Sequence, residues 1–563
     1  MDNIMDLDYR SPEALALGFM SGCVMHILFY RRGEWDLFAT RLVQIYMVVP
    51  LIVIGVMGIA EHKALLNSMS LTAATASVLL LESAHIVGIF SSILVYRTVF
   101  HRLNRFPGPF CARISNLYPT YLRTKNIRLY EEVEELHQKH GDFVRLGASE
   151  LSIVHPKAVE AIYSNKSPCT KGPFYNVLHP RTPVHHVRNH KEHAVRRKPW
   201  DRAFSSKALR DYEPRVTQYT SQLLDRFSEL QNKPINASEW FNFYSFDVMG
   251  DLAFGKSFDM LRGGVKHYFM ISLHESMKMV GYVAHMTWIF PFLKMIPAVD
   301  AESTKFWAWC ESQVQERSKA NFLHQQSKPD NPDVFSWILE EYERNPKTKQ
   351  AKLNLDAEAY LIAVAGSDTT AASLTSLFFE LASNPSQIVK LRKEVDEYFD
   401  QRAHADSSSL ATLTHLNACI DEALRLHPPV PSGMQRVTPP QGLMIGDTMV
   451  PGNTIVQVPL HTVHRDERHF EKPLEFIPER WTTSPELTKD SSIFIPFSIG
   501  RYSCVGKQLG LMEMRYVVAH VIRAFDFKLA DGQTREAFRQ SKMDTFTLAT
   551  PRLDLVFTSR PTA

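Results

Sequence analysis

The sequence predicts a mainly α-helical protein with small β-sheets, preceded by N-terminal transmembrane helices. Three observations lead to this fold class. About 105 residues at the N-terminus hold three long apolar stretches, and the chain beyond them carries apolar residues mostly at the 3.6-residue period of helices. Strand candidates are few and short, and they do not alternate with helices in the βαβ rhythm of a parallel sheet.

The composition is that of an ordinary globular protein, which excludes disordered, collagen-like and fibrous classes. Of 563 residues, 45% are hydrophobic and 22% charged, with 63 Lys and Arg against 60 Asp and Glu. A net charge of +3 gives no reason to expect nucleic acid as a partner. Six cysteines in so long a chain cannot form a disulfide scaffold, which favours a reducing, intracellular environment.

Three N-terminal stretches are long enough to cross a bilayer as helices: residues 14–30, 42–60 and 71–96. The third contains Glu82, whose ionised form would cost about 2.5–3.5 kcal/mol near the middle of a membrane. Glu82 is therefore either protonated or turned toward the other helices. A cleaved signal peptide has a basic start, whereas three acidic residues precede the first stretch here: Asp2, Asp6 and Asp8.

Basic residues near the ends of these stretches predict their orientation. Arginines cluster between the first and second stretches and again after the third, whereas Lys63 stands between the second and third. The N-terminus is then lumenal and the chain after Arg105 cytosolic, as in a multi-pass membrane protein. We expect residues 1–105 to form the anchor, the proline-rich segment 106–111 a hinge, and residues 112–563 one soluble domain.

Periodicity and turn residues predict the main elements of the soluble region. Five long helices are expected, at residues 212–230, 356–382, 386–399, 415–426 and 507–525. Five strands are expected, at residues 143–146, 151–154, 454–458, 525–529 and 553–557. Two polar segments, 345–352 and 403–409, are expected to be solvated loops.

The most informative segment is 497–506, Phe-Ser-Ile-Gly-Arg-Tyr-Ser-Cys-Val-Gly, which leads into an apolar helix. Cys504 stands between two glycines at a helix start, where backbone N–H groups favour the thiolate. Gly500 permits a tight turn and Gly506 a close approach to the backbone. A phosphate loop needs different glycine spacing, and a nucleophile elbow needs glycine in place of Pro496, so both are excluded. A buried structural cysteine is the plain alternative.

This segment resembles the haem-binding loop of the cytochrome P450 superfamily, Phe-x-x-Gly-x-Arg-x-Cys-x-Gly. Four residues match at the right spacing: Phe497, Gly500, Cys504 and Gly506. The resemblance implies a haem b cofactor with Cys504 as the axial iron ligand. The family's arginine, which pairs a haem propionate, is replaced by Tyr502, and Arg501 stands one residue early, so either residue is a candidate for that contact.

Residues 365–370, Ala-Gly-Ser-Asp-Thr-Thr, lie inside the expected helix 356–382. Glycine and β-branched residues are poor choices in mid-helix, which indicates either a function or a plain helix-packing notch. The hexapeptide resembles the oxygen-activation motif of the same family. By resemblance, Asp368 and Thr369 relay protons to bound oxygen, and Ala365 with Gly366 leaves room for that oxygen.

Glu422 and Arg425 stand three residues apart on one face of an expected helix, which alone is a weak signal. Together with the segment 476–481, Phe-Ile-Pro-Glu-Arg-Trp, they resemble the buried Glu–Arg–Arg triad of the family, completed here by Arg480. The three residues would then be structural and hold the fold beneath the haem.

Three further residues resemble haem-propionate contacts of the family. His193 and Arg197 stand in the register of its Trp-x-x-x-Arg motif, with histidine in place of tryptophan and Arg196 as a competing candidate. Arg436 follows the proline-rich turn 428–431. For any single arginine, a solvated surface position is the plain alternative.

The motifs imply a monooxygenase that inserts one atom of O2 into a lipophilic small molecule, and the three-span start resembles fungal members of secondary-metabolite pathways. Electrons would come from an NADPH-cytochrome reductase at the endoplasmic reticulum membrane, with Arg501 and Lys507 as candidates for its docking site. Membrane lipids are the other expected partner.

By resemblance, five residues are candidates for the walls of the substrate pocket: Val364, Ala365, Val430, Met434 and Phe546. Further Met and aromatic candidates, for which core packing is the plain alternative, are Phe269, Met270, Met277, Met279 and Trp288. Two other classes of function stay open. One is a haem-thiolate enzyme that isomerises or rearranges peroxides without activating O2, against which Asp368 and Thr369 argue. The other is a non-catalytic membrane scaffold or haem sensor.

Overall fold

The computed structural model describes residues 11–62, 71–324, 333–402 and 404–561, which divide into two compact units. Unit 1 comprises Met1–Tyr118, Arg145–Ser149 and His285–Asp300; unit 2 comprises Pro119–Val144, Glu150–Ala284 and Ala301–Ala563. The acidic start, Lys63 and Ala403, which entered our predictions, lie outside the described residues. The expected boundaries at residues 105 and 111 stay predictions.

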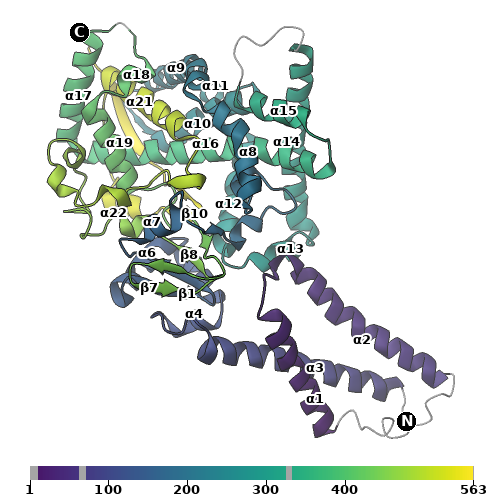
Figure 1. The fold of residues 1–563 in the computed structure, drawn as a ribbon. Helices are drawn as coiled ribbons and strands as arrows, with labels where there is room; N and C mark the ends of the chain where they lie inside the picture. The colour runs from purple at the N-terminus through teal and green to yellow at the C-terminus, as the bar shows by residue number, and fades with distance from the viewer. Residues whose placement is uncertain (1–10, 63–70, 325–332, 403, 562–563) are drawn as a thin grey trace. The chain divides into compact units, whose positions relative to one another are not determined.

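Unit 1 contains three long apolar helices (Figure 1), α1 Pro12–Met25, α2 Ala39–His62 and α3 Leu71–Val95. Helices α1 and α3 run on into π-helical turns at His26–Tyr30 and Tyr96–Phe100, and a 3₁₀ turn at Asp36–Phe38 precedes α2. With these turns, all three are long and apolar enough to cross a membrane by length and composition. The predicted apolar helices at the N-terminus are therefore present.

Helices α1 and α3 pack closely because glycines stand where their backbones meet. A Cβ at Gly22 would lie 2.0 Å from the carbonyl oxygen of His85, and one at Gly88 would lie 2.0 Å from that of Phe19, so larger residues do not fit. Two side-chain hydrogen bonds join the same helices: Ser21 Oγ with His85 Nδ1 at 2.7 Å, and His26 Nδ1 with Ser92 Oγ at 2.8 Å. Small residues and interhelical polar contacts are what hold helices together in a membrane.

Glu82, the charged residue of the third apolar stretch, is half-buried and lines a cavity of about 610 Å³ among α1, α2 and α3. His85 of α3 and Tyr46 of α2 line the same cavity, and their side chains are hydrogen-bonded at 3.2 Å. Of the two alternatives for Glu82, this placement favours the one in which the side chain turns toward the other helices.

The proline-rich segment 106–111 packs against the chain. Gly108 has a φ of +148°, and a Cβ there would lie 2.6 Å from the carbonyl oxygen of Arg145, so glycine is needed at this position. The N–H of Arg145 donates to the carbonyl oxygen of Pro107 at 2.8 Å. The short helix α4, Phe110–Ile114, begins at the end of the segment, and another short helix of unit 1 is α13, Phe290–Leu293.

Helices dominate the rest of the chain. Those longer than ten residues are α6 Leu129–His140, α8 His190–Ala203, α9 Ser206–Glu229, α10 Ala237–Phe254, α12 Tyr268–Val283, α14 Pro297–His324, α15 Val334–Arg344, α16 Lys349–Ser383, α17 Pro385–Asp400, α19 Thr414–Leu426 and α21 Lys507–Ala524. Shorter ones are α5 Leu117–Asn126, α7 Ala158–Tyr163, α11 Met260–Gly263, α18 Ser407–Leu410, α20 Leu460–Val463 and α22 Arg535–Gln540. The five long helices expected from periodicity are all present, so the mainly helical fold class is confirmed.

Helix α16 crosses the middle of unit 2 in Figure 1 and forms its centre. Most of its residues between Leu355 and Leu381 are buried, and α10 and α21 pack along it. Its composition alone would allow a membrane span, but 72% of its most apolar stretch is buried inside the protein. The apolarity of α16 therefore serves the protein core.

Two segments expected to be loops are partly helical, so those predictions are wrong in part. Helix α16 begins at Lys349 within the segment 345–352, because the side chain of Thr348 accepts a hydrogen bond from the N–H of Ala351 and caps the helix. Helix α18 begins at Ser407 within the segment 403–409, where Asp406 caps it in the same way. Both capping residues lie in polar segments, and polar composition alone predicts a loop.

The described strands are short and build small sheets. They are β1 Phe143–Gly147, β2 Glu150–Ile153, β3 Thr170–Lys171, β4 Pro234–Asn236, β5 Arg436–Val437, β6 Leu443–Ile445, β7 Thr448–Val450, β8 Ile455–Gln457, β9 Phe525–Leu529, β10 Met543–Thr545, β11 Thr547–Ala549 and β12 Asp554–Ser559. In unit 2 the neighbours are β2-β8-β5-β3, β4-β12-β9, β6-β7 and β10-β11. The five predicted strands are present; the others are too short to show a period.

The carboxylate of Glu422 on α19 joins two buried arginines. Arg425 Nε and Nη2 donate to its two oxygens at 2.9 and 2.8 Å, and Arg480 Nε donates at 2.9 Å. All three side chains are fully buried. The indole of Trp481 and the N–H of Ile477 also donate to Glu422, and backbone carbonyls accept the remaining arginine hydrogens. A buried charge cluster needs this degree of hydrogen bonding to be stable.

Glu422→Ala leaves two buried guanidinium groups without their carboxylate, so we expect it to lower the free energy of unfolding by about 3–5 kcal/mol. Chemical denaturation of the purified full-length protein in detergent measures this loss.

Glu397→Ala is the matched control, because Glu397 is largely exposed and lies 4.0 Å from Lys393 on the surface of α17. Such a pair is worth less than about 1 kcal/mol. Equal losses for the two variants would contradict a structural role for the Glu422 cluster.

Candidate functional site

The cysteine loop is held by tight turns before α21. A 3₁₀ turn, Gly500–Tyr502, precedes Cys504, whose N–H donates to the carbonyl oxygen of Phe497 at 2.8 Å. Gly500 has a φ of +72°, and a Cβ there would lie 2.3 Å from the carbonyl oxygen of Tyr163, so only glycine fits. Gly506 stands directly before α21, where a Cβ would lie 3.8 Å from Cys504 Sγ. The loop thus presents one sulfur at the start of a buried helix.

The Cys504 side chain is accessible, although protein atoms surround it closely. Desolvation by these surrounding atoms raises the pKa of the thiol, while hydrogen bonds from the backbone N–H groups of Gly506 and Lys507 and the charge of Arg197 lower that pKa. The same backbone groups would stabilise a thiolate bound to a metal. The arrangement suits a metal ligand better than an inert core cysteine, which would be covered.

Helix α16 has one open face in an otherwise buried stretch. Ala365 is exposed and Thr369, one turn later, is half-exposed, and Thr369 Oγ1 donates to the carbonyl oxygen of Ala365 at 2.7 Å. Gly366 serves packing: a Cβ there would lie 2.5 Å from Met249 Sδ of α10. Room beside Thr369 is therefore left by Ala365, and the expected contribution of Gly366 to that room is corrected.

Helix α21, which follows the cysteine, packs beside this part of α16. A Cβ at Gly510 would lie 3.8 Å from Thr370 Oγ1. Asp368, next to Thr369, is nearly buried, and its Oδ1 lies 3.0 Å from His274 Nε2 of α12. The structure thus brings the cysteine helix and the acid–threonine pair of α16 into one part of unit 2.

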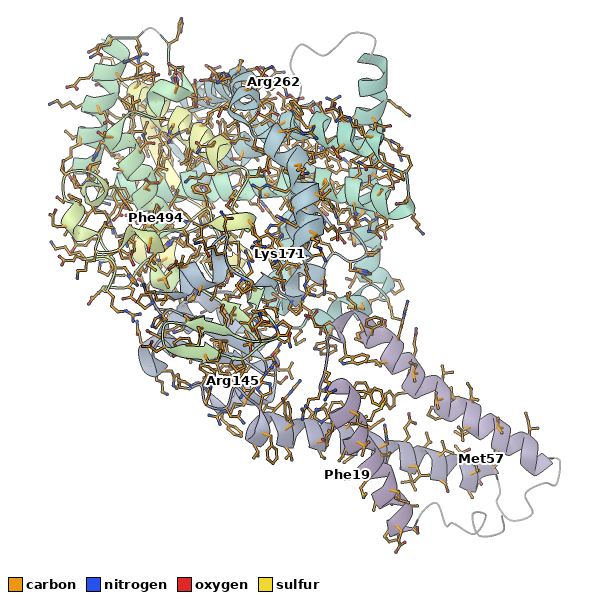
Figure 2. All side chains as sticks on the ribbon, in the orientation of Figure 1. Phe19, Met57, Arg145, Lys171, Arg262 and Phe494 are labelled. Carbon is orange, nitrogen blue, oxygen red and sulfur yellow. The ribbon has the colours of Figure 1, made fainter. Side chains whose placement is uncertain are left out.

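Two buried basic residues face each other across neighbouring strands. Strands β3 and β5 pair antiparallel with Lys171 directly opposite Arg436, and both side chains are about 98–99% buried. Like charges opposite each other in a sheet are unfavourable. Burial, together with the charges of Arg436 and Arg197, holds the pKa of Lys171 well below its usual range. Figure 2 shows Lys171 among the packed side chains near the lower end of α8.

The acceptors around these two groups are mostly neutral. Lys171 Nζ donates to the carbonyl oxygens of Val184 and His185, and Arg436 donates to the carbonyl oxygen of Gln435 at 3.0 Å. Arg436 Nε is buried and finds no partner among the described residues. Glu358, which raises the pKa of Lys171, is itself bound to Arg196 at 2.6 Å. The site therefore has unmet capacity for an anion.

Tyr502, and not Arg501, lies at this pair. The Tyr502 ring stacks against both cations, 4.6 Å from Lys171 Nζ and 4.9 Å from the guanidinium of Arg436. Its hydroxyl is buried without a described partner. Arg501 is engaged elsewhere, with the carbonyl oxygens of Asn165 and Ser167 and with the ring of His190. Of the two candidates for the position of the family's arginine, Tyr502 therefore lies at the buried basic pair and Arg501 does not.

Of the predicted residues on α8, Arg197 and His193 contact the cysteine loop, whereas Arg196 does not. Arg197 Nη1 donates to the carbonyl oxygen of Ser503 at 2.9 Å, beside the cysteine, whereas Arg196 binds Glu358. His193 is buried against the Tyr502 ring at 4.7 Å, and burial with the charges of Lys171 and Arg197 lowers its pKa to about 3. His193 is therefore neutral near pH 7 and can donate one hydrogen bond.

These residues fit the haem that the sequence resemblance implies. A haem presents one iron, which needs an axial ligand, and two carboxylates, which need donors. The loop offers Cys504, and Arg436 Nε, beside the buried amine of Lys171, offers a donor without a described partner. The hydroxyl of Tyr502 adds a further free donor. The donor set and the accessible sulfur match the chemistry of that group.

The five predicted pocket residues differ in exposure. Ala365 belongs to the open face of α16, whereas Val364 belongs to the core. Val430 and Met434 are half-buried, and the carbonyl oxygen of Met434 accepts from Tyr163 at 2.7 Å. Phe546 forms the tip of the β10–β11 hairpin with a φ of +83°, and its ring stacks on Phe174 at 5.2 Å.

Of the further candidates, most have other roles. Phe269 is fully buried in an aromatic cluster with Phe306 and Trp309. Met279 and Trp288 are 48% and 45% exposed, so the idea that they line an internal pocket is not supported. Met270 and Met277 do line a cavity, of about 350 Å³, which Asp368 also lines.

The sequence did not single out four residues at this site: Lys171, which lies outside the predicted pocket walls, and His185, His186 and His274, which lie within the broad ranges 172–188 and 258–296 that the family resemblance gave for those walls. Burial lowers the pKa of His186 to about 3 and that of His185 well below its usual range, so both are neutral beside Lys171. The histidine pair in the sequence was the available signal. Lys171 and His274 carry no local motif, because strand pairing and helix packing bring them to the site.

Lys171→Met removes a buried donor, so we expect faster release of haem. A charge-assisted hydrogen bond worth about 1.5–3 kcal/mol corresponds to roughly 10-fold or more in the rate of transfer to a haem acceptor such as apomyoglobin. Lys191→Met on the exposed side of α8 is the control and should leave the rate unchanged. An unchanged rate for Lys171→Met would show that this amine does not hold the cofactor.

Comparisons with known proteins identify the family. Residues 115–557 match the family model for cytochrome P450. The chain is 51% identical to cytochrome P450 monooxygenase FCK2 of Fusarium pseudograminearum, over 98% of this chain and 99% of the relative. It is 44% identical to cytochrome P450 monooxygenase orf5 of Eupenicillium brefeldianum (88% and 99% covered) and 36% identical to tryprostatin B 6-hydroxylase of Aspergillus fumigatus (99% of each). With its helical fold and its cysteine loop, the chain therefore belongs to the cytochrome P450 family of monooxygenases.

Proposed function

We propose that this chain is a membrane-anchored haem-thiolate monooxygenase that oxidises a lipophilic small molecule in a fungal secondary-metabolite pathway. The observation that carries the proposal is the accessible Cys504 at the start of α21, beside the open face of α16. A relative named as a 6-hydroxylase supports insertion of oxygen into a C–H bond as the reaction class.

Cys504 would bind the iron of haem b, with the N–H groups of Gly506 and Lys507 donating to its sulfur. Lys171, Arg436 and the Tyr502 hydroxyl would bind the propionates, with His193 and Arg197 beside them. The tight turn at Gly500 and the ring of Phe497 hold the loop in place. The chemistry that the haem supplies when bound is activation of O2 for transfer of one atom to the substrate.

The chain's own residues would deliver protons and shape the pocket. Thr369 Oγ1 bonds the carbonyl oxygen of Ala365 and lies on the open face of α16, where its hydroxyl can pass a proton. Asp368 is the adjacent acid that resupplies it. Substrate walls would come from the same face and from the half-buried Val430, Met434 and Phe546, which supports an apolar ligand.

Electrons would come from an NADPH-cytochrome reductase. Lys507 is exposed at the start of α21, next to the cysteine, and would attract an acidic partner. Arg501 is engaged in the loop and is the weaker candidate for docking. The three apolar helices support a multi-pass anchor in the endoplasmic reticulum membrane, with the haem domain in the cytosol.

The proposal is tested with the full-length protein reconstituted in membranes with a reductase and NADPH, and supplied with lipophilic small molecules and isotopically labelled O2. We expect a product that carries one labelled oxygen atom, with NADPH consumed. Conversion that needs neither NADPH nor O2 would assign the chain to the isomerase class instead. Haem binding without turnover of any compound would favour a sensor or scaffold.

Thr369→Val removes the hydroxyl but keeps the side-chain shape, so NADPH oxidation should continue while its electrons go to hydrogen peroxide. We expect the product formed per NADPH to fall by about 10-fold or more, since a positioned proton donor is lost. The ratio of product, peroxide and NADPH measures this effect.

Thr370→Val is the matched control, because Thr370 is buried against α21 and lies off the open face. Equal coupling ratios for the two variants would remove Thr369 from the proposed proton path.

Tyr502→Phe removes one unpaired hydroxyl, and we expect about 5-fold faster haem release, as for a hydrogen bond worth about 1 kcal/mol. Tyr398→Phe, whose hydroxyl bonds Ser409 of α18 and no residue of the cysteine loop, is the control. Unchanged release in Tyr502→Phe would show that the Tyr502 hydroxyl does not bind a propionate.

A further inference from the structure

The pair formed by His274 and Asp368 connects the acid of α16 to an open cavity. His274 Nε2 lies 3.0 Å from Asp368 Oδ1, within hydrogen-bond distance. The side chain of Asp368 is 9% exposed, whereas that of His274 is 36% exposed. The imidazole is therefore in contact with solvent on one side and with a nearly buried carboxylate on the other.

The cavity has many polar lining residues and is large enough for several waters. Its volume is about 350 Å³, and both Asp368 and His274 line it. Charged and amide side chains of the elements around it supply water partners: Asn236, Glu239, Asn242, Lys266, Glu275, Lys278 and Arg552. Lys266 and Glu239 pair at 2.9 Å, and Lys278 and Glu275 at 2.8 Å, so the carboxylates of these two pairs are already bound to cations.

We infer that His274 is a positioning and proton-relay residue that connects solvent in this cavity to Asp368. The inference rests on the proposed function, since it deepens the proton path through Asp368 and Thr369. Because Asp368 is nearly buried, its proton supply needs a residue that contacts solvent. His274 of α12 provides that contact, which the motif residues of α16 do not.

The relay step balances without any electron transfer. An N–H bond forms at His274 Nδ1 as an O–H bond of a cavity water breaks, which leaves hydroxide in the solvent-open cavity. The N–H bond at Nε2 breaks as its proton passes to the carboxylate oxygen Oδ1 of Asp368. The step leaves the charge of the imidazole unchanged, and exchange of its tautomers restores the starting form. Asp368 can then pass the proton to the Thr369 hydroxyl, the next residue on α16.

The packing around His274 holds the ring in this position. Its ring meets Phe246 of α10 edge-on at 5.8 Å, and Leu273, the preceding residue on α12, is fully buried. A fixed ring and a fixed carboxylate are what a proton donor needs, because transfer depends steeply on donor–acceptor geometry. A flexible surface histidine would not have these contacts.

Three variants of the full-length, haem-loaded protein separate relay from mere support. His274→Gln can still donate a hydrogen bond to Asp368 but cannot exchange protons through a ring. His274→Ala removes both abilities. His140→Gln, at the half-exposed end of α6, is the matched control for the loss of a histidine.

Product per NADPH, peroxide formed and the solvent isotope effect on turnover are measured for each variant. We expect both His274 variants to lose coupling by on the order of 10-fold to 100-fold, at or below the lower end of what a positioned proton donor contributes. The isotope effect should rise, and His140→Gln should behave as wild type. Recovery of wild-type coupling by His274→Gln would overturn the relay and leave only a structural hydrogen bond.

A second measurement does not depend on turnover. The midpoints of thermal unfolding of His274→Ala, Asp368→Asn and the double variant should be non-additive, as for two groups in contact. Additive shifts would overturn the pair itself. Failure of the wild type to form product would count against the proposed function, whereas a productive wild type with fully coupled His274 variants would count against this inference alone.

Discussion

The position of the cysteine loop depends on the buried carboxylate of Glu422. Arg425, bound to Glu422, donates to the carbonyl oxygen of His464, and the ring of His464 accepts from the N–H of Ile495, two residues before the loop begins. On its other side Glu422 accepts from the indole of Trp481, whose ring packs on Phe494 at 4.6 Å. Both routes end at the start of the cysteine loop. Through these contacts the charge cluster supports the segment that leads into the cysteine loop.

The site is completed by groups that are unfavourable without a ligand. Lys171 and Arg436 are buried opposite each other, and the Tyr502 ring lies against both, with a buried hydroxyl that has no partner among the described residues. On α16, Ala365 leaves an exposed notch in a stretch that is mostly buried. Burying like charges and leaving donors unmet both cost free energy. A flat dianionic cofactor with an apolar body would satisfy all three features, which is why the fold and the cofactor support each other.

Much of this could be predicted from sequence, and the rest could not for a physical reason. The cysteine loop and the α16 hexapeptide are recognisable because each is a short segment with a characteristic spacing. The Glu422 cluster is recognisable because two such segments, 422–425 and 476–481, supply its residues. The choice between Arg501 and Tyr502 could be made only from the structure. The two residues are neighbours in one tight turn, and the turn decides which side chain faces the cations. Lys171 and His274 reach the site through a two-residue strand pair and a helix contact, and neither leaves a pattern in the sequence. The helical caps at Thr348 and Asp406 were hidden by polar composition.

The central claim is that Cys504 is the axial ligand of a haem iron. The most direct test is the carbon monoxide difference spectrum of the reduced, full-length protein, wild type beside Cys504→Ser. Ligation by Cys504 predicts the strongly red-shifted Soret band of a thiolate-ligated haem in the wild type and its loss in Cys504→Ser. A haem-loaded wild type without that band, or a Cys504→Ser variant that keeps it, would contradict the account.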